Sequence, residues 1–295
     1  MWQVKIARFL SGLKSLLARA GLTRLPLVKQ LSARAARMFL RRVDQMGSQA
    51  VSIKLRGINL VLPKRFYSHY VLHEYEPVTQ RVFTELIRPG MTVVDVGAHI
   101  GYYSLLAARA VGQAGAIHAV EPCEENLSYL RQNISLNGFN NIQVHPYAAG
   151  RERGRRTFHI TGSSDSHGFY PHPLTTTLET VEMTEMPLDE IIDGNIDAVK
   201  IDVEGVELMV LEGMSRIINE NRNLIVWVEW MPACMKNAGY DPADLPAYLE
   251  RLGFGDIQVL DDHDMKRRPL DEVLPLVRSG NLPSSWYVNL LARRS

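Results

Sequence analysis

The chain has 295 residues, 46% of them hydrophobic and 22% charged, a composition typical of a soluble globular protein. Two cysteines are too few for a disulfide framework or a zinc site, and no apolar run approaches the length of a membrane span. The first 45 residues carry ten basic side chains and one acid, whereas the remainder carries 23 basic and 31 acidic ones. We therefore expect a cytoplasmic protein with a basic N-terminal arm on a mildly acidic body.

Residues 1–48 are predicted to form this arm as two amphipathic helices, over about 2–20 and 26–43. Trp2, Ile6, Phe9 and Leu13 recur at helical spacing, with most basic residues off that stripe. Such helices can pack on the protein's own body, lie on an anionic membrane or dock on a partner protein, and these alternatives stay open. The arm has few aromatic residues for base stacking, so nucleic acid is not an expected partner.

The next segment, residues 49–75, is predicted to hold a β-hairpin and a connector. The stretch VSIKLRGINLVLP, residues 51–63, alternates apolar and polar residues on both sides of Arg56-Gly57. This pattern is typical of a hairpin and marks the end of the arm.

From residue 91 onward, short apolar runs alternate with helical segments, which predicts an α/β, Rossmann-like fold with a mostly parallel sheet and helices on both faces. Residues 150–196 break this rhythm, and their segment GSSDSHGFYPHP predicts an inserted loop at about 160–180, over the carboxyl edge of the sheet. The expected strands are seven, at 91–96, 115–120, 142–146, 197–202, 223–230, 255–260 and 285–292. The expected helices lie at about 78–88, 102–112, 124–136, 206–219 and 243–252.

A glycine-containing turn follows the first strand of this sheet. It reads Asp95-Val96-Gly97-Ala98-His99-Ile100-Gly101, and ligands of open parallel sheets bind beyond such strand ends. The dinucleotide fingerprint would require glycine at 99 and 102, where the chain has His99 and Tyr102, so a bound pyrophosphate is disfavoured. A carboxylate repels phosphate but suits an ammonium or sulfonium group. S-Adenosylmethionine has both cationic groups and no phosphate.

The second strand ends in another acid, within IHAVEP. Glu121 there can accept both hydroxyls of an unphosphorylated ribose, and Pro122 bends the chain before the next helix. Taken singly, Asp95 and Glu121 could each cap a helix or end a strand in solvent. Their common register with the glycines favours a nucleoside site.

Residues from about 76 to 230 resemble the FkbM-type methyltransferases, a branch of the class I fold that uses S-adenosylmethionine. The matching stretches are VVDVGAHIGYYSLLAA, HAVEPCEENLSYLRQNISLNG, VHPYAAG, PLDEII and DAVKIDVEGVELMVLEGM. The resemblance implies that residues 76–295 form the methyltransferase domain. The basic arm and the predicted loop lie outside the resemblance.

The resemblance also implies roles for particular residues. Asp95, Gly97 and Gly101, with the neighbouring Tyr102, would line the amino-acid part of the cofactor. Glu121, with Pro122, would hold the ribose, while Tyr147 and Ala148 would flank the adenine. Glu76 would reach the ammonium group. The family usually has Asn where this chain has His99, and both side chains can bond to nearby backbone.

The candidate groups for proton transfer are carboxylates at strand ends. Asp202 and Glu204, in KIDVEG, are predicted on the cofactor side and toward the acceptor respectively, although one could cap the next helix and Lys200 could pair with the other. Glu229 ends the very apolar strand VWVEW, where a carboxylate is costly unless it is used or paired. His167 and His172, in the loop, are further candidates for a base or an acceptor contact. His263 is assigned to a surface turn, and no metal is predicted.

These features predict an S-adenosylmethionine-dependent O-methyltransferase. By analogy with the family, its acceptor would be a hydroxyl on a glycan, a lipid-linked saccharide or a secondary metabolite. One alternative is N-methylation of a protein or peptide. Another is a catalytically silent binding protein that docks through its N-terminal helices, although the set Asp95, Gly97, Gly101 and Glu121 argues against it. The basic arm would suit work at a membrane surface on a lipid-linked or anionic acceptor.

Overall fold

The structure is a computed structural model, which describes residues 50–66, 70 and 75–294. The predicted arm, residues 1–48, lies outside the described residues. The chain divides into two compact units, residues 1–77 and 78–295, and each is considered by itself.

The described part of the first unit contains the predicted hairpin. Strands β1 (Ala50–Leu55) and β2 (Ile58–Pro63) pair antiparallel, and a 3₁₀ turn, η2 (Lys64–Phe66), follows. Arg56 and Gly57 connect the strands with φ values of 47° and 86°. Two positive φ values in a two-residue loop match the right-handed twist of the strands, so the expectation for residues 51–63 is confirmed.

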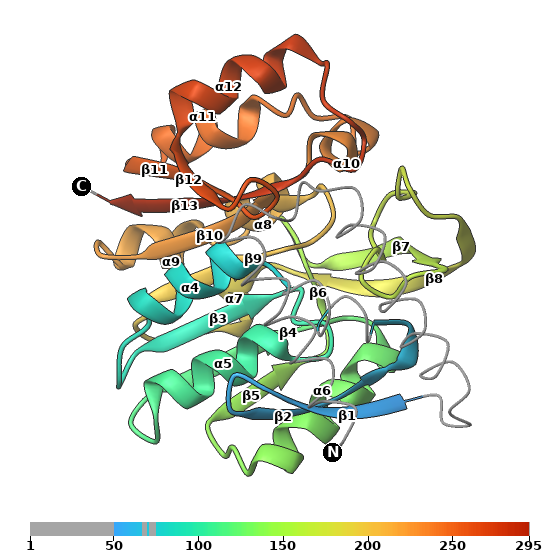
Figure 1. The fold of residues 1–295 in the computed structure, drawn as a ribbon, viewed down its shortest axis with the longest axis vertical. Coiled ribbons are helices and arrows are strands. Elements are labelled where there is room, and N and C mark those ends of the chain that lie inside the picture. Colours follow the sequence, from blue (N-terminus) through green and yellow to red (C-terminus); the bar gives the residue numbers. More distant parts are fainter. Residues whose placement is uncertain (1–49, 67–69, 71–74, 295) are drawn as a thin grey trace, which may run out of the picture. The chain divides into compact units, whose positions relative to one another are not determined.

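The second unit is built on an eight-stranded sheet (Figure 1). Its order is β12-β11-β13-β10-β9-β3-β4-β5, and only β12 and β13 run against the other strands. All seven expected strands are present, and the α/β class is confirmed. Their bounds are β3 (Thr92–Val96), β4 (Ala116–Val120), β5 (Ile142–His145), β9 (Ala198–Ile201), β10 (Ile225–Trp230), β11 (Phe254–Asp261) and β13 (Val288–Arg294), with β12 (Lys266–Pro269) in addition.

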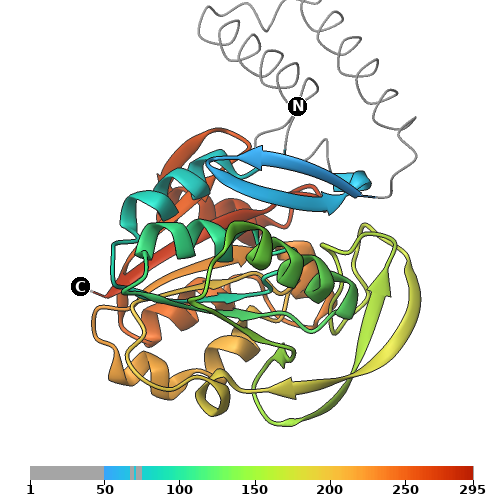
Figure 2. The same cartoon turned by 90° about the horizontal axis from the view of Figure 1, so that it is seen from below.

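Helices cover both faces of this sheet, as Figure 2 shows edge-on. One face carries α4 (Pro77–Leu86), α5 (Tyr102–Val111) and α6 (Glu124–Asn137), where the rings of Phe83, Tyr103 and Trp227 pack edge to face. The opposite face holds an extensive apolar cluster, made of strand valines and isoleucines with leucines of the other helices. Those helices are α7 (Leu188–Ile191), α8 (Glu207–Glu212), α9 (Ser215–Glu220), α11 (Asp244–Arg251) and α12 (Leu270–Ser279).

The helix expected at 206–219 is two helices, α8 and α9. A Cβ atom on Gly213 would lie 1.9 Å from the backbone oxygen of Gly150, so the chain can approach only at a glycine there. The carboxylate of Asp189 then accepts hydrogen bonds from the backbone N–H groups of Arg216 and Ile217 and starts α9. These contacts come from distant segments, which explains why local periodicity did not show the break.

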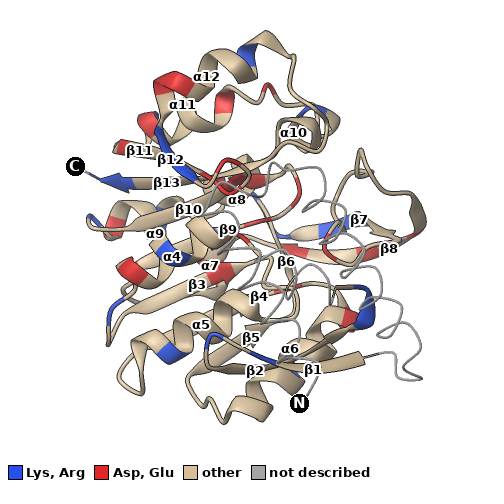
Figure 3. Cartoon of the chain, in the orientation of Figure 1, with Lys and Arg blue, Asp and Glu red and all other residues tan. Residues whose placement is uncertain are grey.

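The interval 150–196 holds more than a loop. Strands β7 (Gly154–Thr161) and β8 (Thr177–Met186) form a hairpin that joins the short β6 (Ala148–Ala149) in a three-stranded sheet. Figure 3 shows basic residues on β7 beside acidic residues on β8. The expected loop is confined to 162–176, between these strands. No helix in the described ranges has the length and hydrophobicity that a membrane span requires.

Candidate active site

The candidate site lies where the order of the sheet reverses, at the carboxyl end of β3. Strands β4 and β9 flank β3 on its two sides, and open α/β sheets bind ligands at such a reversal. The N–H groups of Gly97 and Ala98 donate to the oxygen of Val120, over 2.9 and 3.0 Å. On the other side, Asp202 N donates to Val96 O over 3.0 Å. The three strand ends with predicted site residues are therefore joined.

The glycine turn owes its residue types to the protein's own packing. Gly97 has φ 79°, and a Cβ atom there would lie 1.8 Å from the backbone oxygen of Asp202. Gly101 has φ 91°, and its Cβ atom would lie 2.5 Å from Cδ1 of Leu130. Both conformations disfavour other residues. The position that a Cβ atom would take at each glycine is thus occupied by the protein's own chain, by Asp202 directly after β9 and by Leu130 of α6.

Glu121 is a prearranged acceptor at the end of β4. Its Oε1 accepts from Cys123 N over 2.9 Å and from Asn126 Nδ2 over 3.1 Å, while Oε2 accepts from His99 N over 2.9 Å. The residue is 5% exposed, and burial raises the pKa of its carboxyl to about 7 despite these bonds. A carboxylate fixed beside the glycine turn fits the hydroxyls of a ribose.

His99 links the turn to the β7–β8 loop. Its φ of 51° is a left-handed conformation in which His and Asn are enriched, in agreement with the Asn that the family usually has there. Its Nε2 lies 3.0 Å from Oγ of Ser164, and Asn126 Nδ2 donates to Ser164 O over 3.2 Å. Ser164 is 3% exposed, so this end of the loop is packed against the nucleoside side of the site.

Two predicted cofactor residues make contacts within the protein. Asp95 accepts a hydrogen bond from Ser104 Oγ over 2.6 Å, and burial raises the pKa of its carboxyl. Tyr102 donates from its hydroxyl to Gln80 Oε1 over 2.9 Å. Their cofactor roles stay predictions.

The other predicted cofactor residues follow strand ends or lie in the first unit. Pro122 directly follows Glu121, and Tyr147 N donates to His145 O over 3.0 Å just before the buried Ala148 begins β6. Glu76 belongs to the unit of residues 1–77, so its predicted reach to the ammonium group is not tested.

Three predicted carboxylates converge on the other side of the turn. Asp202, Glu204 and Glu229 each place an oxygen so that the three oxygens lie within 4.8 Å of one another. Lys200, which is 2% exposed, donates to Asp202 Oδ2 over 2.6 Å and lies 4.6 Å from the ring centroid of Tyr103. Lys200 thus pairs with Asp202, which was one of the two alternatives predicted for the carboxylates of KIDVEG. These oxygens could share a cation, but no metal is predicted.

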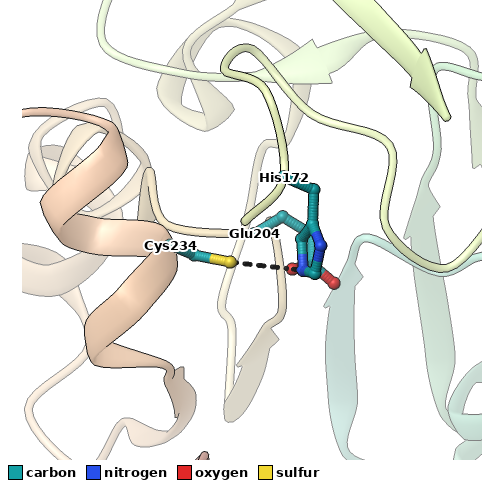
Figure 4. A group of neighbouring side chains, drawn as sticks. All are labelled: His172, Glu204 and Cys234. Carbon is teal, nitrogen blue, oxygen red and sulfur yellow. Dashed lines mark hydrogen bonds and ion pairs between the residues drawn. The ribbon is translucent and has the colours of Figure 1, made fainter. Parts of the chain in front are cut away.

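Glu204 has the most distinctive surroundings of the three (Figure 4). Its Oε2 lies 3.2 Å from His172 Nε2 and 3.4 Å from Sγ of Cys234, in α10 (Pro232–Asn237). Burial raises the pKa of Glu204; the bond from His172 lowers it, and the charge of Asp202 raises it further. Its φ of 59° is a strained conformation of the kind that concentrates at functional sites. A buried carboxylate with a raised pKa is suited to take up a proton from a bound acceptor.

A further buried carboxylate at this strand end is that of Glu207, the first residue of α8, which sequence reasoning did not single out. Its Oε1 accepts from Gly205 N over 2.9 Å, and the residue is 1% exposed. Burial raises the pKa of this carboxyl to about 7. Because it lies within KIDVEGVELMVLEG, its position directly before the apolar run of residues 208–211 was the available signal.

The two loop histidines are placed differently. Nδ1 of His167 accepts from Thr161 N over 3.1 Å, within its own loop, and its catalytic role stays a prediction. His172 is the one that meets Glu204. His263 lies in a turn, as expected, with its ring 4.9 Å from that of Tyr287.

The strand order, the reversal beside β3 and the antiparallel β13 define the class I, S-adenosylmethionine-dependent methyltransferase fold. The sequence profile described as "Methyltransferase FkbM domain" matches residues 95–255. The chain therefore belongs to the FkbM methyltransferase family, whose cofactor is S-adenosylmethionine.

Three similar proteins illustrate the range of likeness. "Methyltransferase 1" of Beauveria bassiana is 24% identical over 144 residues, 41% of this chain and 57% of that protein. A protein-L-isoaspartate O-methyltransferase of Pyrobaculum islandicum is 22% identical over 215 residues, 66% of this chain and 98% of that protein. The crystal structure of methyltransferase FkbM from Methylobacillus flagellatus is 20% identical, with a TM-score of 0.43, over 78% of this chain and 52% of that one. The chain thus spans little more than half of the fungal relative.

Proposed function

We propose that this protein transfers the methyl group of S-adenosylmethionine to a hydroxyl oxygen of a saccharide, a lipid-linked saccharide or a related secondary metabolite. The observation that carries the proposal is the position of Glu204. This buried carboxylate with a raised pKa follows β9, two residues after Asp202, whose backbone packs against Gly97 of the cofactor turn. On this proposal, the proton acceptor and the nucleoside site share one edge of the sheet.

The residues divide the work between binding and proton transfer. Glu121 would hold the ribose through its two oxygens, kept in place by the N–H groups of His99 and Cys123. The bound cofactor supplies a carbon activated by positive sulfur, which a nucleophile displaces in line. Glu204 would accept the proton of the acceptor hydroxyl as the O–C bond forms, so that no free alkoxide is required. Lys200 donates to Asp202 Oδ2 and fixes that carboxyl beside it.

The proposed acceptor class rests on the family resemblance and on the carboxylates at the carboxyl edge of the sheet. A hydroxyl needs a base, and the described strand ends supply carboxylates for that purpose. A second candidate is a protein or peptide acceptor, because the Pyrobaculum relative is named as an enzyme that methylates isoaspartyl protein. An N-methyl acceptor on a peptide belongs to the same candidate.

Calorimetry with S-adenosylhomocysteine tests the cofactor half of the proposal. We expect micromolar binding by the wild-type chain and at least ~10-fold weaker binding by Glu121→Ala, because the ribose contacts are lost. Glu204→Gln should bind like the wild type, since its side chain is assigned to the acceptor. Absence of binding by a folded wild-type chain would contradict the proposal.

Transfer of a labelled methyl group tests the acceptor half. Saccharide and lipid-linked saccharide pools are offered beside an isoaspartyl peptide, and Glu204→Gln is the matched variant. We expect label in the saccharides at a rate that Glu204→Gln lowers by ~10²-fold or more. Label found in the peptide alone would select the second candidate.

A further inference from the structure

The β7–β8 hairpin supplies the site with a histidine that the central sheet does not provide. The loop 162–176 touches the site at two places, through Ser164 at the glycine turn and through His172 at Glu204. Asn237 of α10 donates to the oxygen of Pro171 over 2.6 Å, directly before His172. A Cβ atom on Gly168 would lie 3.4 Å from Cβ of Glu204, so the loop packs closely over that residue.

The hydrogen bonds of His172 define which ring nitrogen carries the proton. Leu174 N donates to Nδ1 of His172 over 3.2 Å, so Nδ1 is the acceptor nitrogen. Nε2 then carries the hydrogen of the neutral ring, and it faces Oε2 of Glu204 at 3.2 Å. The side chain is 6% exposed, which leaves the ring little freedom to turn. With both nitrogens engaged, His172 donates to Glu204 and is not itself placed as the base.

We propose that His172 is a positioning residue: it donates from Nε2 to Oε2 of Glu204 and thereby presents Oε1 to the acceptor hydroxyl. The contacts of His172 and Cys234 both fall on Oε2, and Figure 4 shows the second oxygen turned away from Cys234. This inference rests on the proposed function, in which Glu204 takes the proton. On this inference, the β7–β8 hairpin orients the base.

The effect of His172 on the pKa of Glu204 is opposite to that of the acidic groups around Glu204. Acids approach from three elements: Asp202 at the end of β9, Glu207 in α8 and Glu229 in β10. Their charges disfavour ionisation of Glu204, and Cys234 of α10 adds only a weak donor. The bond from His172 lowers the pKa of Glu204, which burial raises. Removal of this donor should therefore raise that pKa and leave less carboxylate at neutral pH.

Turnover against pH tests the positioning role with three variants. His172→Phe removes the donor, His172→Gln keeps an N–H near the place of Nε2, and His263→Gln alters a histidine in a distant turn as the matched control. We expect His172→Phe to lower kcat ~30-fold or more and to move the acidic limb of kcat to higher pH. His172→Gln should retain at least about a third of kcat, and His263→Gln should match the wild type. An unmoved acidic limb in His172→Phe would overturn the inference.

Two measurements that need no acceptor keep the inference separate from the proposed function. S-Adenosylhomocysteine affinity should be the same in His172→Phe and wild type within about 2-fold, which also shows that the variant folds. Long-range ¹H–¹⁵N spectra of the wild-type ring should show the Nε2-protonated tautomer. An Nδ1-protonated ring would overturn the inference even if methyl transfer is established. Failure of every acceptor would instead count against the proposed function.

Discussion

At the scale of single residues, Glu121 shows how burial and hydrogen bonding oppose each other in one side chain. Three N–H donors favour the ionised carboxylate, and burial favours the neutral acid, with the pKa raised to about 7 as the result. A carboxylate is the form that accepts two ribose hydroxyls. The nucleoside site is therefore open to control by protons near neutrality.

We predict that affinity for S-adenosylhomocysteine depends on pH through Glu121. With a pKa of about 7, the carboxylate is mostly ionised at pH 8 and mostly protonated at pH 6, so binding should weaken as the pH falls. The expected loss between these values is about 10-fold. Calorimetry at both pH values measures it, with Glu121→Gln as the comparison. A wild-type affinity as flat as that of Glu121→Gln would contradict the prediction.

A second prediction at this scale compares two glycines. Gly97→Ala combines a φ of 79° with a Cβ atom 1.8 Å from Asp202 O, whereas Gly138→Ala has a φ of 66° and nothing within 4 Å. We expect a loss of unfolding free energy of about 1 kcal/mol for Gly138→Ala, from strain alone. For Gly97→Ala we expect about 3 kcal/mol or more, since backbone must move. Urea denaturation gives both values, and equal losses would show that the close approach is unimportant.

At the scale of elements, β4 and β5 carry a stacked pair of histidines. Nδ1 of His118 lies 3.0 Å from Nε2 of His145, and the ring centroids are 5.3 Å apart. Burial lowers the pKa of both rings, to about 4 for His145, where the neighbouring His118 contributes as well. One ring cannot become charged without disturbing the other.

This pair should make stability fall on mild acidification. In the unfolded chain both histidines take up protons near pH 6.5, whereas in the folded chain His145 does so only near pH 4. The unfolded state binds more protons in that window, so unfolding free energy decreases as the pH falls from 7.5 to 5.5, by about 1–2 kcal/mol from this pair. The double variant His118→Gln with His145→Gln should lose that part of the slope in urea denaturation. If unfolding free energy depends on pH in the same way in the variant, the histidine pair is not the cause of the decrease.

The elements also show what could be predicted from the sequence. Strands such as β3 and β9 are short, apolar and buried on both faces, so their position followed from hydrophobicity. β8, with five exposed and three half-exposed positions, carries charges that hide its alternation, and it was missed. For the site, Glu121 and Glu204 were predictable because they end strands. The contact of His172 with Glu204 was not, because it depends on how a hairpin folds over a distant strand end.

At the scale of the whole molecule, the described part of the unit of residues 78–295 has its own core and carries the candidate site residues other than Glu76. The basic arm lies outside the described residues, and of the three roles left open for it we propose the one at an anionic membrane surface. Ten basic residues against one acid in residues 1–45 would supply the attraction.

We predict that deletion of residues 1–45 abolishes membrane binding and leaves cofactor binding intact. The full chain should sediment with vesicles that contain phosphatidylserine and be released by salt, and the shortened chain should stay in the supernatant. Affinity for S-adenosylhomocysteine should be the same in both, as calorimetry would show. Sedimentation of both proteins, or of neither, would assign the arm to a protein partner or to the chain's own body.

The division of labour between the sheet edge and the β7–β8 hairpin has a consequence for how related enzymes diversify. The strand ends assigned to the methyl donor touch one another through backbone, so little can change there without loss of the fold. The hairpin lies between β6 and α7 in the chain, and its loop reaches Glu204, the proposed base, from outside the central sheet. On the proposed function, evolution can exchange this hairpin and redirect methylation to a new acceptor, while the residues assigned to the donor stay unchanged.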